Sequence, residues 1–271
     1  EGEFIVHGDK PLGIQYGLAA LLEKMGYRFW HPYDPLIPTE FQTPSFQSTL
    51  QQPKVARRGV HLHTLHPIEA TEAFWISDQD LEARKIMDWV IKNRGNYLQW
   101  VALDDIVGSS STAQKWQDRT RHLLQLGHDR GLKMGLGIQL FGSGNLQQAF
   151  DLVDDTEGDL GMQIQDRLEI ISKDLDWDVL NLSFGEFTSE DPQVFIDNAT
   201  LMAQKTHMLL PATELTATIH VGDDLQVEYQ GQQMLYYFLI QYVEDFVPWV
   251  HTVMYYNLFE PAGGAYGHTD F

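Results

Sequence analysis

The sequence predicts an α/β protein whose main part is a (β/α)8 barrel of the TIM type, preceded by the remnant of a small α/β domain. Three observations lead to this prediction. From residue 58 onward, stretches with helical periodicity alternate with short apolar stretches. The apolar stretches are nearly continuous, as in strands covered on both faces, and several end in polar or acidic residues. About six such strands are visible, whereas a closed barrel has eight, so the barrel is truncated at its C-terminal side, incomplete, or an open sheet.

The composition is that of an acidic globular protein. A chain of 271 residues can bury a full-sized core. The 18 Lys and Arg stand against 38 Asp and Glu, which gives a formal net charge of −20. Because no basic stripe is present, nucleic acid is not expected as a partner. The absence of cysteine excludes disulfides, thiolate nucleophiles and cysteine-bound metals. No run approaches the ~18 to 20 apolar residues of a membrane span, and the oligomeric state is left open.

Residues 1–50 are predicted to form the partial small α/β domain. Phe4–Val6 is expected to be a short strand, and Leu12–Met25 a helix that stops at Gly26. Tyr27–Trp30 is expected to be a second strand, followed by a proline-rich exit. Two strands and one helix are too few for an independent core, so we expect this unit to pack on another part of the protein. Because the chain starts abruptly in a strand, we also expect part of this domain to precede residue 1.

A polar stretch, Gln42–Lys54, is expected to link this domain to the barrel, which takes up residues 55–271. The expected barrel strands are Arg58–Thr64, Tyr97–Leu103, Leu132–Leu140, Asp178–Phe184, Leu215–Val221 and Trp249–Tyr256. The expected helices are Asp80–Asn93, Thr112–Arg130, Leu146–Val153, Met162–Leu175 and Pro192–Thr206. Alternating strands and helices of this kind are typical of a parallel sheet covered by helices.

A family resemblance is carried by three nearby segments, Gly13–Leu18 (GIQYGL), Leu21–Glu23 (LLE) and Gly26–Pro32 (GYRFWHP). They resemble the end of the small N-terminal α/β domain of α-glucuronidases, β-hexosaminidases and related glycoside hydrolases. The resemblance implies a catalytic barrel after this domain, an oligo- or polysaccharide substrate, a role in carbohydrate metabolism, and a periplasmic or secreted location. Arg58-Gly59 stands where hexosaminidases begin the barrel with an arginine that binds the sugar, so the resemblance implies that role for Arg58.

Three carboxylates are candidates for catalysis. Glu186 follows the fourth predicted barrel strand on a glycine turn, where a barrel keeps its functional residues. Asp104 and Asp105 end the second strand and could supply the partner carboxylate that glycoside hydrolysis requires. The competing interpretation is that Glu186 is a solvated loop acid and that the two aspartates belong to an ordinary loop with a helix cap.

The predicted sugar-binding residues also lie at strand ends. Imidazole, phenol, amide and carboxylate groups there can hydrogen-bond to sugar hydroxyls. The set is Arg58, His61, His63, Tyr255, Tyr256, Asn257 and Glu260, with Glu260 as a third candidate carboxylate. Trp30, Trp75 and Trp100 could form stacking surfaces, although most aromatic residues simply belong to the core.

The histidines support a different interpretation, because His61, His63, His220 and His251 lie on the strands from which metal-dependent amidohydrolases draw their ligands. Neutral imidazoles on rigid strands suit Zn²⁺ or a similar ion. The main prediction, an acid–base hydrolase, requires no metal and no cofactor. A carbohydrate-binding protein without activity and a structural fragment of a larger enzyme also stay open.

Overall fold

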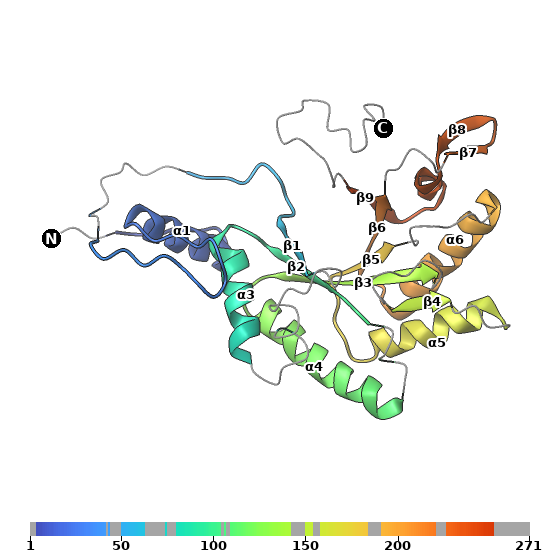
Figure 1. The fold of residues 1–271 in the computed structure, drawn as a ribbon, viewed down its shortest axis with the longest axis horizontal. Coiled ribbons are helices and arrows are strands. Elements are labelled where there is room, and N and C mark those ends of the chain that lie inside the picture. The colour runs from blue at the N-terminus through green and yellow to red at the C-terminus, as the bar shows by residue number, and fades with distance from the viewer. Residues whose placement is uncertain are drawn as a thin grey trace. The chain divides into compact units, whose positions relative to one another are not determined.

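The computed structural model describes residues 4–41, 43, 50–62, 74, 80–103, 106, 109–141, 150–153, 158–183, 191–220 and 226–251. They form a mixed α/β protein with a mainly parallel sheet (Figure 1). The chain divides into two compact units. Unit 1 comprises residues 1–100 and 118–135, and unit 2 comprises residues 101–117 and 136–271. In the described residues, no helix is long and apolar enough to cross a membrane.

Unit 1 holds the first helices and strands. Its elements are α1 (Pro11–Lys24), β1 (Gly59–Leu62), α3 (Asp80–Lys92), most of β2 (Tyr97–Val101), the second half of α4 (Ser110–His128) and the start of β3 (Lys133–Phe141). β1 and β2 are parallel, with Gly59 opposite Tyr97 and Leu62 opposite Trp100. β3 begins on the other side of β2, since the Lys133 amide donates to the Asn96 carbonyl at 2.9 Å.

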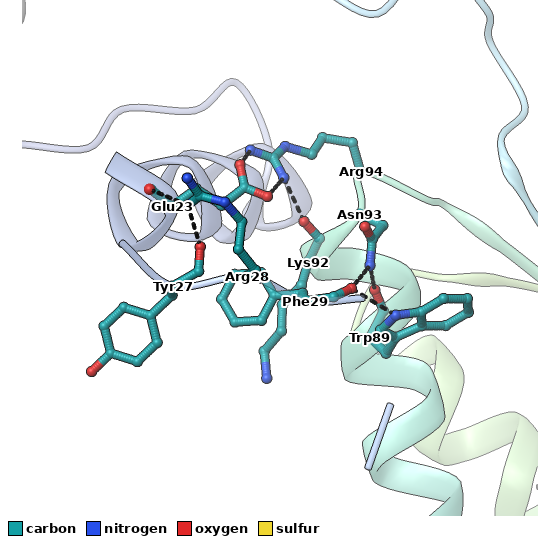
Figure 2. A network of polar contacts seen from close by, with 8 residues as sticks. All are labelled: Glu23, Tyr27, Arg28, Phe29, Trp89, Lys92, Asn93 and Arg94. Atoms are coloured by element: carbon teal, nitrogen blue, oxygen red, sulfur yellow. Dashed lines mark hydrogen bonds and ion pairs between the residues drawn. The ribbon is translucent and has the colours of Figure 1, made fainter. Parts of the chain in front are cut away.

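The segment after α1 is attached to α3 by a polar network (Figure 2). α1 ends before Gly26, which has the left-handed φ of 104° that favours glycine. The Phe29 carbonyl then accepts hydrogen bonds from Trp89 Nε1 and from Asn93 Nδ2, both at 2.9 Å. The ammonium group of Lys92 lies 5.2 Å from the centre of the Phe29 ring. The residues that carry the family resemblance are therefore held against α3 within unit 1.

Unit 2 holds the remaining elements. They are β4 (Asp151–Val153), α5 (Leu160–Ser172), β5 (Val179–Ser183), α6 (Pro192–Leu209), β6 (Glu214–His220), β7 (Gln226–Tyr229), β8 (Gln232–Leu235), the 3₁₀ helix η2 (Tyr236–Tyr242) and β9 (Phe246–His251). The strands follow the order β3-β5-β6-β9, β4 pairs with β3, and β7 and β8 form a separate antiparallel hairpin. Asp159 and Asp191 cap α5 and α6, because their side chains accept from the amides of Met162 and Gln193.

The two faces of the strands in unit 2 differ in polarity. Buried apolar residues on β5 and β6 face the same way as register partners: Leu180 with Leu215, and Leu182 with Ala217. Alternate residues face the opposite way because side chains alternate along a strand. On that face the partners Asn181 and Thr216 are polar. The helices α5 and α6 lie next to each other (Figure 1) and complete the core with Ile164, Leu168, Ile171, Phe195, Ala199 and Met202.

Most predicted elements are confirmed, with ends that differ by a few residues. Three expectations are wrong. Phe4–Val6 is not a strand, because Val6 packs its side chain over Gly17 of α1 instead of joining a sheet. Tyr27–Trp30 contains only an isolated antiparallel bridge between Arg28 and Leu36. Residues 151–153 belong to β4 and not to a helix, because the sheet offers hydrogen-bonding partners to this segment.

The hairpin β7-β8 and the helix η2 were not expected at all. Both lie in the connection from β6 to β9, where a barrel would place an α-helix. η2 takes that place, since it packs against α6, β6 and β9 and buries Tyr236, Leu239 and Ile240. The α/β class and the parallel sheet are confirmed, while closure into a barrel and the boundary between residues 50 and 55 stay predictions.

Candidate functional site

Most predicted site residues lie outside the described residues. These are Asp104, Asp105 and Glu186 among the candidate catalytic residues, and His63, Tyr255, Tyr256, Asn257 and Glu260 among the candidate sugar-binding residues. Arg58 and His61 are described in full. For His220 and His251, the structure describes the backbone positions on β6 and β9.

Arg58 lies just before β1, at the amino end of the strand. Its Nε donates to the Arg94 carbonyl at 2.8 Å, and its Nη1 donates to the Ala56 carbonyl at 3.1 Å and to the Val55 carbonyl. The guanidinium also lies 5.8 Å from the ring centre of Tyr16, whose pKa is raised by burial despite this positive neighbour. Arg58 thus ties the segment before β1 to α1 and to the end of α3. Its predicted sugar contact stays a prediction.

His61 belongs to the polar face of unit 1. It is exposed and lies opposite Gln99 in the register of β1 and β2. Tyr97, two residues earlier on the same face, donates its hydroxyl to Gln99 Oε1 at 2.5 Å. Gly135 of β3 makes room for this hydroxyl, because a Cβ at Gly135 would lie 2.0 Å from it. Gln99 is nevertheless buried, so the sheet keeps hydrogen-bonded polar groups inside unit 1.

Unit 2 has a polar hydrogen-bonded chain on β5 and β6. Thr218 Oγ1 donates to Asn181 Oδ1 at 2.8 Å, and Asn181 Nδ2 donates to Thr216 Oγ1, also at 2.8 Å. Thr216 Oγ1 lies 3.5 Å from the Leu180 carbonyl, at the limit of a hydrogen bond. Asn181 and Thr216 are buried, whereas Thr218 is partly exposed. The polar face therefore becomes accessible toward the carboxyl ends of the strands.

The register of β6 and β9 extends this face by one strand. Thr218 is the partner of Trp249, and His220 is the partner of His251. Partners on neighbouring parallel strands are about 4.8 Å apart and project to the same face. The two histidine positions are thus adjacent at the carboxyl end of the sheet, next to Thr218 and the partly exposed Trp249.

No group of three or more histidine, cysteine, aspartate or glutamate side chains that could hold a metal ion occurs among the described residues. Within them, the metal hypothesis is supported only by the adjacent positions of His220 and His251.

The aromatic candidates separate clearly by burial. Trp100 is fully buried and packs edge-on against Phe74, with ring centres 5.4 Å apart, so Trp100 is a core residue. Trp30 is exposed, and Trp75 lies outside the described residues. Trp249, which the sequence analysis did not single out, is the tryptophan on the polar face of β6 and β9.

Two predicted site residues of unit 2, Glu186 and Tyr255, come a few residues after strands that end at the same edge of the sheet. β5 ends at Ser183, three residues before Glu186, and β9 ends at His251, four residues before Tyr255. Both strands flank β6 and run parallel to it. Parallel neighbours end at the same edge, so these two strand ends are about 12 Å apart, two strands across and two residues along the strand direction.

Sequence reasoning missed Asn181, Thr216, Thr218 and Trp249. The signal was present as polar residues at every second position, in NLS on β5, TAT on β6 and WVH on β9. Such alternation in an otherwise apolar strand indicates one face that is not part of the apolar core.

No protein-family model and no curated protein matches this chain. Solved structures with similar segments include a mutant of an O-GlcNAc hydrolase from Thermobaculum terrenum, with 10% identity, a TM-score of 0.47 and coverage of 71% of this chain and 40% of that one. A GH20 exo-β-N-acetylglucosaminidase from Vibrio harveyi, in complex with N-acetylglucosamine, has 11% identity, a TM-score of 0.39 and coverage of 62% and 36%. A GH18 chitinase from Pseudoalteromonas aurantia has 15% identity, a TM-score of 0.34 and coverage of 53% and 49%. This chain thus spans less than half the length of each, and similarity at this level assigns it no family.

Proposed function

We propose that this chain is a carbohydrate-active hydrolase that cleaves a glycosidic bond by carboxylate acid–base chemistry. The observation that carries the proposal is the polar chain Asn181–Thr216–Thr218, which becomes exposed toward the carboxyl ends of β5 and β6. In α/β proteins this edge of a parallel sheet is where ligands bind. Neutral hydroxyl and amide groups suit the hydroxyls of a sugar.

In the proposed reaction Glu186 protonates the leaving oxygen, and Asp104 or Asp105 provides the supporting carboxylate. The segment with Tyr255, Tyr256, Asn257 and Glu260 follows the neighbouring strand end and binds the sugar. Arg58, His61 and His63 are further proposed sugar contacts. The contact of Arg58 is supported by the family resemblance alone, because Arg58 lies at the amino end of β1. A (β/α)8-type barrel is the proposed scaffold. Its support is the buried polar face of the strands, since a barrel encloses the face that its helices do not cover.

An exported location, periplasmic or secreted, and a role in carbohydrate metabolism are part of the same proposal. They are supported by the resemblance of the segments from Gly13 to Pro32 to the small domain of α-glucuronidases and β-hexosaminidases.

The proposal is tested with aryl glycosides of glucose, N-acetylglucosamine and glucuronic acid in both anomeric forms. Each sugar is offered with a good leaving group, 4-nitrophenol, and a poor one, 4-methoxyphenol. Glu186→Gln removes the proton donor, so kcat/KM should fall about 10²- to 10⁴-fold for the 4-methoxyphenyl glycoside. The loss should be smaller for the 4-nitrophenyl glycoside, because its leaving group needs less protonation. Asp104→Asn and Asp105→Asn identify the supporting carboxylate.

The matched control is Glu169→Gln on α5, where the carboxylate only accepts a hydrogen bond from Gln165 at the surface. This variant should retain full activity. The proposal is wrong if the wild-type protein hydrolyses none of these glycosides, or if Glu186→Gln acts like the control. Activity that a chelator removes and Zn²⁺ restores would instead support the metal-dependent alternative. Sugar binding without hydrolysis would indicate a carbohydrate-binding protein.

A further inference from the structure

We propose that Trp249 and Thr218 form a binding surface for a pyranose ring at the carboxyl end of β6 and β9. This inference deepens the proposed function and relies on it for the class of ligand. It begins from the register, in which Thr218 and Trp249 are direct partners on neighbouring parallel strands. Their side chains therefore project to the same face, about 5 Å apart at the backbone.

The hydroxyl of Thr218 is hydrogen-bonded to the buried polar chain. Its proton is donated to Asn181 Oδ1, and the Asn181 amide is itself held by its hydrogen bond to Thr216. Because Asn181 is buried and hydrogen-bonded at both ends of its amide, its side chain is held in place beneath Thr218. Thr218 Oγ1 is therefore directed as an acceptor toward a donor that approaches from the exposed end of the face.

The accessibility of the side chains agrees with a ligand at this end. Thr216 and Asn181 are buried in the middle of the sheet, while Thr218 and Trp249 are partly exposed. A ligand that approaches from this end therefore meets Thr218 and Trp249 before the buried polar groups beneath them.

The chemistry of the two side chains suits a pyranose. One face of a pyranose ring presents C–H groups that pack on an indole, and the ring edge carries hydroxyls that can donate to a threonine oxygen. Nucleobases also stack on tryptophan. However, β5, β6 and β9 contain no lysine or arginine that would bind a phosphate, and the whole chain carries a net charge of −20. A neutral or weakly charged sugar is the ligand that these strands favour.

The experiment measures equilibrium binding by titration calorimetry in the Glu186→Gln background, so that turnover does not interfere. The probes are the methyl α- and β-glycosides of glucose, N-acetylglucosamine and glucuronic acid, together with cello- and xylo-oligosaccharides. Trp249→Leu should lower the affinity for the bound sugar about tenfold or more, because the flat π surface is lost. Trp249→Phe should lower it less than Trp249→Leu. Thr218→Val should lower it about three- to tenfold.

Two matched controls separate binding from stability. Trp116→Leu replaces another partly exposed tryptophan, on α4, and Thr213→Val removes a buried hydroxyl that donates to the Trp177 carbonyl at the amino end of β6. Both variants should keep the wild-type affinity within about twofold, although Thr213→Val should unfold more easily.

The inference is overturned if Trp249→Leu binds within twofold of its parent, or if none of the probes binds to the parent protein. Should Trp249→Leu fail to fold, the variants Trp249→Phe and Thr218→Val decide, and unchanged affinity in both overturns the inference. The proposed hydrolysis can fail separately. If Glu186→Gln has no effect on hydrolysis while Trp249→Leu weakens sugar binding, the binding surface stands and the catalytic assignment does not.

Discussion

Arg94 and Glu23 form a two-point ion pair, with Nη1 to Oε1 at 2.9 Å and Nη2 to Oε2 at 2.5 Å (Figure 2). Arg94 follows α3 and has a left-handed φ of 64°, a conformation that costs free energy for any residue other than glycine. Glu23 lies in the last turn of α1. The ion pair thus joins α1 to the end of α3. The left-handed backbone of Arg94 closes α3, because the Arg94 amide donates to the Ile91 carbonyl at 2.8 Å and the Gly95 amide donates to the Val90 carbonyl at 2.7 Å.

Replacing Arg94 should separate these two effects. Arg94→Ala loses the ion pair and keeps the strained backbone, so the free energy of unfolding should fall by about 1 kcal/mol. Arg94→Gly also loses the ion pair but relieves the strain, so it should be less destabilising than Arg94→Ala by about 0.5 kcal/mol. Urea denaturation measures both values. Arg121→Ala, which breaks an exposed pair with Asp118, serves as the control and should change stability by less than about 0.5 kcal/mol. Equal stability of the alanine and glycine variants would show that the left-handed backbone at position 94 has no measurable strain.

Asp80 should make the stability of unit 1 depend on pH. Hydrogen bonds from His122 Nε2 at 2.7 Å and from Arg119 Nη1 at 2.9 Å lower the pKa of its carboxyl. A lowered pKa means that the charged carboxylate stabilises the fold above its ordinary pKa of about 3.9, and that this contribution is lost as the pH falls through the lowered value. Asp80→Asn should therefore be less stable than wild type by about 1 kcal/mol at pH 6, and this difference should shrink as the pH falls through the lowered pKa.

Urea denaturation between pH 2.5 and pH 7 tests this difference. Asp118→Asn alters an exposed pair on α4 and should show no comparable change of stability with pH. A constant difference between wild type and Asp80→Asn over the whole range would mean that the carboxylate has an ordinary pKa.

Gly135 should tolerate no side chain. A Cβ there would lie 2.0 Å from the hydroxyl oxygen of Tyr97, which is buried and donates to Gln99. Gly135→Ala should therefore lower the free energy of unfolding by about 1 to 3 kcal/mol through overpacking. Tyr97→Phe removes the closest atom, so the double variant should be more stable than the sum of the two single effects indicates. Thermal unfolding of the four proteins measures this coupling, and strict additivity would contradict it.

Substitutions of Asn181 and Thr216 should also have non-additive effects on stability, here because the two side chains share a hydrogen bond. Each single variant, Asn181→Ala or Thr216→Val, leaves its partner buried without this hydrogen bond and should cost about 1 to 3 kcal/mol. The double variant should cost about 1 kcal/mol less than the sum. Thr213 lies just before β6 and outside this hydrogen-bonded chain. The loss of stability caused by Thr213→Val should therefore be additive with that caused by Asn181→Ala. Additive costs for Asn181 and Thr216 would show that the hydrogen bond contributes nothing.

The periodic elements could be predicted from the sequence because their local signals agree with their tertiary surroundings. α5 has an Asp cap and buried Ile164, Leu168 and Ile171 on one face, and β5 is a short apolar run with a strand neighbour on β6. Segments without such agreement were misjudged. Residues 151–153 can join a helical pattern, but the backbone groups of β3 pair with them, and sheet hydrogen bonds outweigh a weak local preference.

The candidate site was predictable only in part. The sequence predicted that His220 and His251 lie on neighbouring strands, but the end of β9 at His251 and the pairing of His251 with His220 depend on the register of β6 and β9, which the sequence does not specify. The role of Arg58 at the amino end of β1 depends on carbonyl groups from Val55, Ala56 and Arg94, which no sequence pattern brings together. Trp249 was overlooked because tryptophan in an apolar strand usually belongs to the core.

β4 separates the carboxyl ends of β2 and β3. The Ala102 amide still donates to the Gly137 carbonyl of β3. Two residues further along β3, the Gln139 amide donates to the Phe150 carbonyl instead, and the Phe150 amide donates to the Ala102 carbonyl. Phe141 and Phe150, which flank residues 142–149, are therefore both anchored in the sheet. Lengthening a stretch with two fixed ends costs little entropy, only about 0.6 kcal/mol for each doubling. The sheet hydrogen bonds of β3, Phe150 and β4 are thus made by residues on either side of positions 142–149, so the pairing of these strands does not require a particular length of chain between Phe141 and Phe150.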